Sequence, residues 1–144
     1  GQNKVSVVYV ENAAQAQIAA DDAIIAKDGP AGGNAYFIAQ EEPVYLWDFI
    51  KKILDGVGVA GPKRSISYAA ARRAGTILEI IHRGLFLPGE PRMTRFVAAQ
   101  LGTSHWYRVD RAKKELGYDP KISTEEGLDR LIAELLDKKI EIIR

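Results

Sequence analysis

The sequence contains no cysteine, only two histidines, and no apolar run as long as the roughly 18 residues that a membrane-spanning helix needs. Without cysteine, disulfide bridges, thiolate metal sites and a cysteine nucleophile are excluded, and the chain suits a reducing compartment. His82 and His105 are the only imidazoles available for metal binding or proton transfer. Neither belongs to a pattern of metal-ligand spacing, so we expect no metal site.

The chain also lacks a strong excess of either charge. Twenty Lys and Arg stand against nineteen Asp and Glu, which leaves a net charge of +1 and no global field to attract nucleic acid. With 144 residues, 47% of them hydrophobic and 27% charged, the composition is that of one soluble globular domain. The chain begins at Gly1 without Met or a secretory leader, so we expect a cytoplasmic protein and a fragment of a longer one.

Residues 1–40 have the pattern of a strand-helix-strand unit. A β-branched and aromatic run over residues 5–10 predicts a buried strand, and Asn12 has the side chain of a helix N-cap. The Ala-rich helix expected over residues 13–27 is apolar nearly all round, which predicts deep burial. A second buried strand is expected over residues 35–39. Such a unit favours a parallel strand pair and an α/β fold.

Residues 41–144 predict a mostly helical part. Apolar residues recur there at helical spacing, and Gly56 and Gly58 fall where a helix would stop. A capping box, Ser123 with Glu126, marks the start of the last helix. Residues 104–109 are aromatic and expected to be extended. The other helices are expected over residues 46–57, 70–85, 91–100 and 110–116, with Gly117 closing the last of these.

Two motifs of nicotinamide enzymes are missing from the chain. Residues 56–61 read G-x-G-x-x-G, but they follow a predicted helix, whereas a dinucleotide site needs these glycines after a strand and before a helix. In short-chain dehydrogenases a Lys four residues after a Tyr lowers the pKa of its hydroxyl, and none of the six tyrosines has one. We therefore expect no catalytic and no cofactor-binding residues in this chain.

Residues 63–95 form the one strongly basic stretch, with seven basic and two acidic residues. A solvated helix face is one interpretation. The alternative is a non-enzymatic binding module that uses this amphipathic stretch on a protein partner or as a peripheral contact with an anionic membrane surface. Aromatic residues for base stacking are not interleaved with the arginines, so we expect no nucleic-acid partner.

Several strings together resemble the C-terminal half of extended short-chain dehydrogenases. More narrowly, they resemble the branch of 3β-hydroxysteroid dehydrogenases, sterol dehydrogenases and dihydroflavonol reductases. Val5 stands where sugar-nucleotide epimerases of the same superfamily usually have Arg, which argues against a nucleotide-sugar substrate. The strings are Val8 to Ala16, Ala35 to Ile38, the helix from Leu46, Asp110 to Tyr118, and Ser123 to Gly127.

The resemblance implies a parent oxidoreductase that uses NAD or NADP on a hydroxyl or keto group of a hydrophobic, sterol- or flavonoid-like substrate. An N-terminal Rossmann half, absent here, would hold the cofactor and the catalytic residues. Residues 1–144 would then be a single substrate-side fragment, with residues 1–40 completing the Rossmann sheet and residues 41–144 binding substrate. Alone, this chain would be inactive and bind no cofactor.

The resemblance also implies where substrate is bound. Tyr9 and Asn12 would lie where a strand passes into a helix beside the cofactor domain. A second group would lie on a segment that faces the substrate cleft, although packing of its aromatic rings explains the same cluster. This second group is Ser104, His105, Trp106 and Tyr107.

Overall fold

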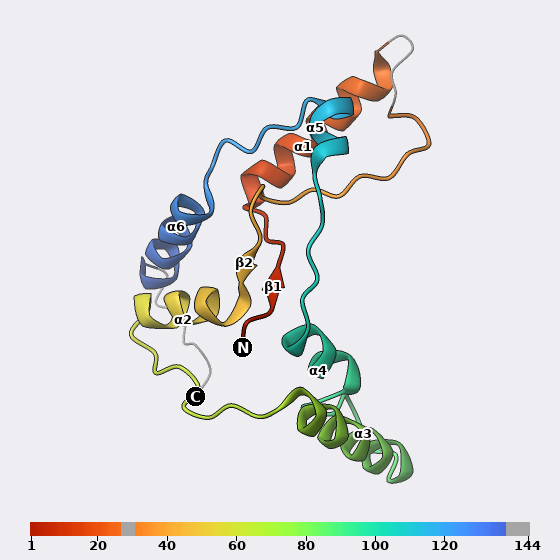
Figure 1. The fold of residues 1–144 in the computed structure, drawn as a ribbon, viewed down its shortest axis with the longest axis vertical. Helices are drawn as coiled ribbons and strands as arrows, with labels where there is room; N and C mark the ends of the chain where they lie inside the picture. The colour runs from red at the N-terminus through yellow and green to blue at the C-terminus, as the bar shows by residue number, and fades with distance from the viewer. Residues whose placement is uncertain (27–30, 138–144) are drawn as a thin grey trace.

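The computed structural model describes residues 1–26 and 31–137. In this part of the chain the backbone forms helices joined by long extended segments, with two very short strands (Figure 1). In chain order the elements are β1 (Lys4–Val5), α1 (Val10–Ile25), β2 (Val44–Tyr45), α2 (Leu46–Gly56), α3 (Tyr68–Gly84), α4 (Arg95–Gly102), α5 (Asp110–Leu116) and α6 (Thr124–Asp137).

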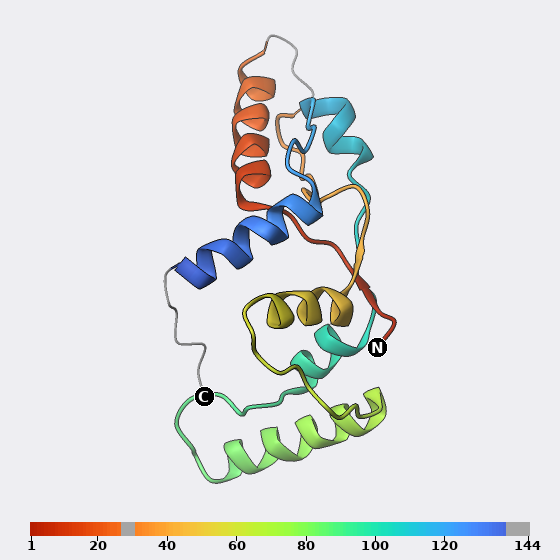
Figure 2. The same cartoon turned by 90° about the vertical axis from the view of Figure 1, so that its left-hand side faces the viewer.

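The helices gather in three groups along the molecule. Helix α1 packs with α5 at one end, α2 packs with α6 in the middle, and α3 packs on α4 at the other end (Figures 1 and 2). Strands β1 and β2 lie in the middle, between the two ends (Figure 1). The helix-rich architecture expected from the sequence is therefore present.

The sheet differs from the expected one. β1 pairs antiparallel with β2, with Lys4 opposite Tyr45, and a parallel bridge joins Val5 to His105. The strand expected over residues 5–10 is limited to Lys4–Val5, and residues 35–39 form no strand. The predicted parallel pair is therefore wrong. Parallel strands are stable when helices bury both faces, and the described residues do not provide that cover.

Local signals predicted most helix boundaries correctly. Helix α2 ends at Gly56, and Gly58 follows with a left-handed φ of 74°. Gly117 closes α5 with a φ of 67°, and the Ser123 hydroxyl accepts a hydrogen bond from the Glu126 amide at the start of α6. Helix α4 begins later than expected because the Thr94 hydroxyl caps it. Each of these signals acts within four residues.

Helix α1 contradicts two expectations. Its N-cap is Tyr9, which makes no side-chain capping bond, so Asn12 is not the cap. The helix is also not buried all round: Ile18, Ile24 and Ile25 are 64%, 60% and 73% exposed. One face packs on α5 and the opposite face has no cover from the described residues, because no sheet forms beneath it.

The core is small for the length of the chain. One buried cluster joins Ala16 of α1 to Ala112 and Leu116 of α5, with Ala31 and Tyr118 beside them. The accessible surface is 10880 Å², whereas a compact protein of 15.9 kDa exposes about 7,400 Å². The chain therefore exposes apolar surface that a compact domain of this mass would bury.

Candidate functional site

Asn12 is the most buried large side chain, at 1% exposed, and is the centre of a polar cluster. Its Nδ2 donates to Gln40 Oε1 at 3.1 Å and to the Ile122 carbonyl at 2.7 Å. Its Oδ1 accepts from the backbone amides of Lys121 at 3.0 Å and Ile122 at 3.1 Å. The amide therefore makes four hydrogen bonds, all of them within the chain.

Gln40, directly after the segment that was expected to be a strand, completes this cluster. Its Nε2 donates to the Ile122 carbonyl at 2.7 Å, and its backbone amide donates to the Val7 carbonyl at 2.7 Å. Three distant segments, around residues 7–12, 40 and 121–122, are thus joined by buried hydrogen bonds. We call Asn12, Gln40, Lys121 and Ile122 the amide cluster.

A cavity of about 490 Å³ lies next to the amide cluster, between the start of α1, α2 and α6. Most of its wall is apolar, and a few polar groups converge on it, which is typical of small-molecule sites. Gln40 belongs to both the cluster and the cavity wall. The wall consists of Val7, Val8, Tyr9, Val10, Gln40, Phe49, Ser123, Thr124, Gly127, Leu128, Leu131 and Glu134.

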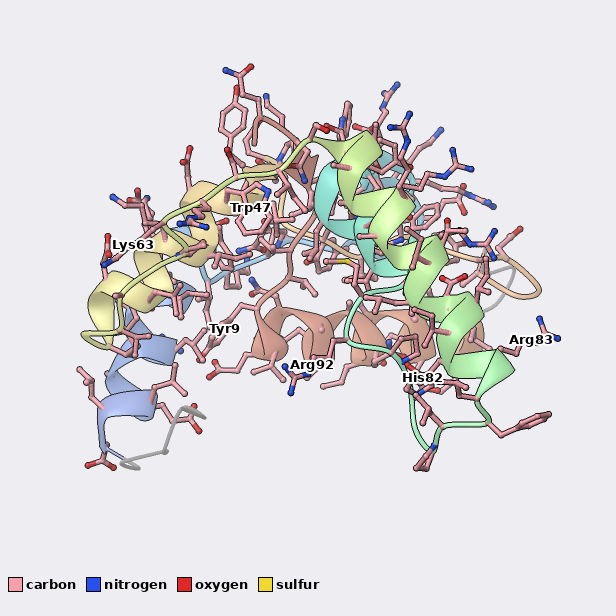
Figure 3. All side chains as sticks on the ribbon, turned by 90° about the horizontal axis from the view of Figure 1, so that it is seen from below. Tyr9, Trp47, Lys63, His82, Arg83 and Arg92 are labelled. Carbon is pink, nitrogen blue, oxygen red and sulfur yellow. The ribbon has the colours of Figure 1, made fainter. Side chains whose placement is uncertain are left out.

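Tyr9 is the predicted site residue that lines this cavity. Its ring packs on Gly127 so closely that a Cβ atom there would lie 2.7 Å from the ring. The Arg130 guanidinium lies 5.7 Å from the ring centroid and is held by Glu126 and Glu11, at 2.6 and 3.2 Å. Figure 3 shows Tyr9 beside α6. The contact with Gly127 and the Arg130 guanidinium therefore both hold the Tyr9 ring in place.

The second predicted group runs along β1 rather than around the cavity. The Ser104 hydroxyl accepts a hydrogen bond from the Lys4 amide at 2.9 Å, and the His105 amide donates to the Lys4 carbonyl at 2.9 Å. Tyr107 stacks on Phe37 with ring centroids 4.0 Å apart. None of these residues lines the cavity wall given above.

The structure thus places the two predicted groups apart: one lies where residues 4–9 lead into α1, and the other lies beside the start of that segment. Tyr9 is at the cavity, and Asn12 is behind it in the amide cluster. Ser104 to Tyr107 accompany Lys4 to Ser6, and Trp106 is half exposed. Substrate binding by these residues stays a prediction.

Sequence reasoning missed Gln40, Phe49 and Gly127 as residues of the cavity wall. Gly127 had a signal that could have found it: a glycine inside a helix is unfavourable and often marks a close approach by another group. Gln40 had none, because its partners are 28 and 82 residues away in the sequence.

A separate charged cluster joins α5 to the segment before Gln40. The Tyr36 hydroxyl donates to Glu115 at 2.6 Å, and Arg111 donates to the same carboxylate at 3.0 Å. The hydrogen bond from Arg111, and after it the one from Tyr36, lowers the pKa of Glu115 below its ordinary value. The bond to Glu115 raises the pKa of Tyr36. This cluster lies outside the cavity wall and fastens α5.

Metal sites and membrane-spanning helices are both absent from residues 1–26 and 31–137. No group of three or more acidic or imidazole side chains could hold a metal ion there. None of the helices in these ranges is both long and apolar enough to cross a bilayer.

Comparison with known proteins gives a consistent set of matches. Residues 1–68 match the 3-beta hydroxysteroid dehydrogenase/isomerase family. The chain is 42% identical over 133 residues to a 2-alkyl-3-oxoalkanoate reductase of Stenotrophomonas maltophilia, covering 92% of this chain and 40% of the reductase. It is 31% identical over 134 residues to the decarboxylating sterol-4-alpha-carboxylate 3-dehydrogenase of Mus musculus, covering 92% and 37%.

The matches span a minor part of each relative. An isoform 2 of 3beta-hydroxysteroid-dehydrogenase/decarboxylase from Arabidopsis thaliana is 33% identical over 138 residues, which is 92% of this chain and 24% of that protein. The crystal structure of gox2253 superimposes with a TM-score of 0.60 and 22% identity, over 99% of this chain and 39% of that one. The fold is therefore shared with a larger protein.

Proposed function

The chain belongs to the 3β-hydroxysteroid dehydrogenase-like branch of the extended short-chain dehydrogenases, and we propose that it is the substrate-side part of an NAD(P)-dependent oxidoreductase. Its reaction would interconvert a hydroxyl and a keto group on a hydrophobic substrate. The observation that carries this proposal is the 42% identity to an oxoalkanoate reductase along 92% of the chain.

The names of the relatives suggest a narrower substrate class. In a 2-alkyl-3-oxoalkanoate, the keto carbon is adjacent to the carbon that bears the carboxylate, and the same is true of carbon 3 in a sterol-4-carboxylate. We propose a β-hydroxy or β-oxo acid with a large hydrophobic body. The apolar cavity beside Tyr9 has a volume and lining suited to part of that body. A flavonoid-like substrate stays a prediction without support among these relatives.

Residues 56–61 do not fit the pyrophosphate of a nicotinamide dinucleotide. The glycines of residues 56–61 end α2, and the next helix, α3, begins only at Tyr68, so no helix N-terminus lies behind them for a pyrophosphate. We propose that the cofactor and the proton-transferring residues belong to an N-terminal Rossmann half. This half would cover the exposed face of α1.

Two measurements test this assignment. Titration of the purified chain with NADH and NADPH in a calorimeter should give no saturable binding. Saturable binding would contradict the proposal that the N-terminal half holds the cofactor. The N-terminal part of the Stenotrophomonas reductase, joined to this chain at the matched boundary, should oxidise NAD(P)H when a 2-alkyl-3-oxoalkanoate is added. The N-terminal part alone is the control. A folded chimera that binds NADPH but turns over neither oxoalkanoate nor sterol carboxylate would refute the substrate class.

A further inference from the structure

Three short extended segments lie side by side in the middle of the molecule: β2, β1 and residues 104–107 (Figure 1). Val44 is opposite Val5 in the antiparallel pair, and Val5 is opposite His105 in the parallel bridge. Residues that are opposite one another point to the same face, and their neighbours along the chain point to the other. Val5 is 5% exposed, so this first face is the inner one.

The second face of these segments combines one cation with two hydroxyl groups. By alternation it carries Lys4, Ser6 and Ser104. The Ser104 hydroxyl accepts from the Lys4 amide at 2.9 Å, and the Ser6 hydroxyl accepts from the Tyr107 amide at 3.0 Å. Within the described residues neither hydroxyl donates a hydrogen bond, so the hydrogen of each is available to a ligand.

The Lys4 side chain is held in place without being neutralised. Its Nζ lies 5.0 Å from the centroid of the Tyr45 ring, which belongs to the residue opposite it in the pair of strands. An aromatic ring attracts a cation but carries no net charge. Lys4 forms no salt bridge with the part of the chain that the structure describes. The ammonium group therefore keeps its charge and its hydrogen-bond donors for another anion.

These three donors match the chemistry of a carboxylate. An ionised carboxylate carries one negative charge, and its two oxygens accept several hydrogen bonds. Lys4 supplies one positive charge, and the two serines supply two O–H donors. A phosphate group carries nearly two negative charges at neutral pH and would favour a second cation. The nearby Arg108 does not supply it, because its guanidinium is paired with Asp110 at 2.7 Å.

We propose that Lys4, Ser6 and Ser104 bind the carboxylate of the substrate, and we call them the carboxylate subsite. The inference rests on the proposed function, which supplies a β-hydroxy or β-oxo acid as the ligand. Lys4 Nζ pairs with the carboxylate, and the two hydroxyls donate to its oxygens. Because the reacting carbon is two bonds from the carboxylate carbon, binding here also fixes the position of the carbon that is reduced. The subsite thus selects acids over neutral ketones.

Titration of the nitrogen-15-labelled 144-residue chain with 3-hydroxyoctanoate, followed by NMR, tests the subsite without any turnover. The acid should shift the amide signals of residues 4–6 and 104–107 in a saturable way. Its uncharged methyl ester should bind about tenfold more weakly. Lys4→Gln should weaken binding of the acid about tenfold and leave binding of the ester unchanged. Lys4→Arg keeps the charge and should keep the preference for the acid.

The matched control is Lys52→Gln, which removes an exposed lysine of α2 that also forms no salt bridge within the described residues. It should leave binding of the acid unchanged. Lys4→Gln should keep the melting temperature of the unsubstituted chain, because the bonds of Lys4 to Ser104 and His105 use its backbone. A loss of binding in Lys4→Gln cannot then be ascribed to unfolding.

Kinetics of the chimera described above separate the subsite from the reaction. Lys4→Gln should raise KM for a 2-alkyl-3-oxoalkanoate about tenfold and leave KM for the corresponding ketone without a carboxylate unchanged. If the chain prefers the acid through Lys4 but the chimera turns nothing over, the proposed reaction fails and the subsite stands. If the chimera is active but Lys4→Gln does not change its preference for the acid, the reaction stands and the subsite fails.

Three results would overturn the carboxylate subsite. They are equal binding of the acid and its ester, unchanged binding of the acid in Lys4→Gln, and equal losses for acid and ester in that variant. The last result would mean that the Lys4 side chain shapes the site without contacting the carboxylate.

Discussion

The two ends of the molecule are held together in different ways. Helix α1 is anchored by the amide cluster, whose hydrogen bonds join residues up to 110 positions apart. Helices α3 and α4 are held by the close approach of Gly75 to Thr94, 19 positions apart, and by the Glu79–Arg95 pair, 16 positions apart. The first end therefore forms only when segments that are distant in the sequence have come together. The second can form and open as a local unit.

The largest effect should come from Asn12→Ala. The substitution leaves the partly buried amide of Lys121, the buried amide of Ile122 and the buried Gln40 side chain short of partners, and each buried group of this kind costs about 1–3 kcal/mol. We expect a loss of about 3–5 kcal/mol in the free energy of unfolding by urea, a large share of a typical total. Gln17→Ala, at an exposed position of the same helix, should change it by less than about 0.5 kcal/mol.

If Asn12→Ala lowers the free energy of unfolding no more than Gln17→Ala does, the amide cluster does not anchor this end. The comparison between the ends would then fail, since both would rest on local contacts.

Gly75→Ala should act at the other end and cost less. The new Cβ atom would meet the Thr94 backbone at 2.7 Å, and the two helices must separate, at about 1–3 kcal/mol. Hydrogen exchange should become faster in α3 and α4 and stay unchanged in α1 and α6. Gly84→Ala, where nothing lies within 4 Å of the new atom, is the control. Faster exchange throughout the chain would show that the α3–α4 pair is not a local unit.

The smallest expected effect is on the way stability depends on acidic pH. The backbone hydrogen bond from Arg95, with its guanidinium, lowers the pKa of Glu79 below its ordinary 4.5. A lowered pKa adds stability that is present above the unfolded value and is lost as pH falls through the folded one. Between about pH 5 and pH 3, Glu79→Gln should therefore make the stability of α3 and α4 less pH-dependent.

The Glu115 carboxylate should behave alike at the first end, because Arg111 and Tyr36 lower its pKa. Glu115→Gln should flatten the acid dependence of exchange in α5 and leave that of α3 unchanged. Both glutamates are partly accessible to solvent, so these changes should be small and should shrink at high salt. A change of the same size in α3 would mean that the two ends are coupled.

The sequence by itself determined the helices and most of their ends. The apolar spacing of α2, α3 and α6, the stops at Gly58 and Gly117, and the cap at Ser123 are all local, since each acts through contacts within a few residues. The family resemblance was also readable, because its strings are short and ordered. The cavity was not, since its wall comes from four distant segments.

Only the tertiary structure decided what the ambiguous residues do. Asn12 has the chemistry of a cap and became the centre of a buried cluster, because its partners lie 28 to 110 positions away. Residues 35–39 have strand composition but form no strand, because a strand needs a neighbour that the described residues do not provide. Phe86 took a glycine's backbone conformation because the cap of α3 closes two residues past Gly84. Local preference sets what a segment can form, and distant partners select among the possibilities.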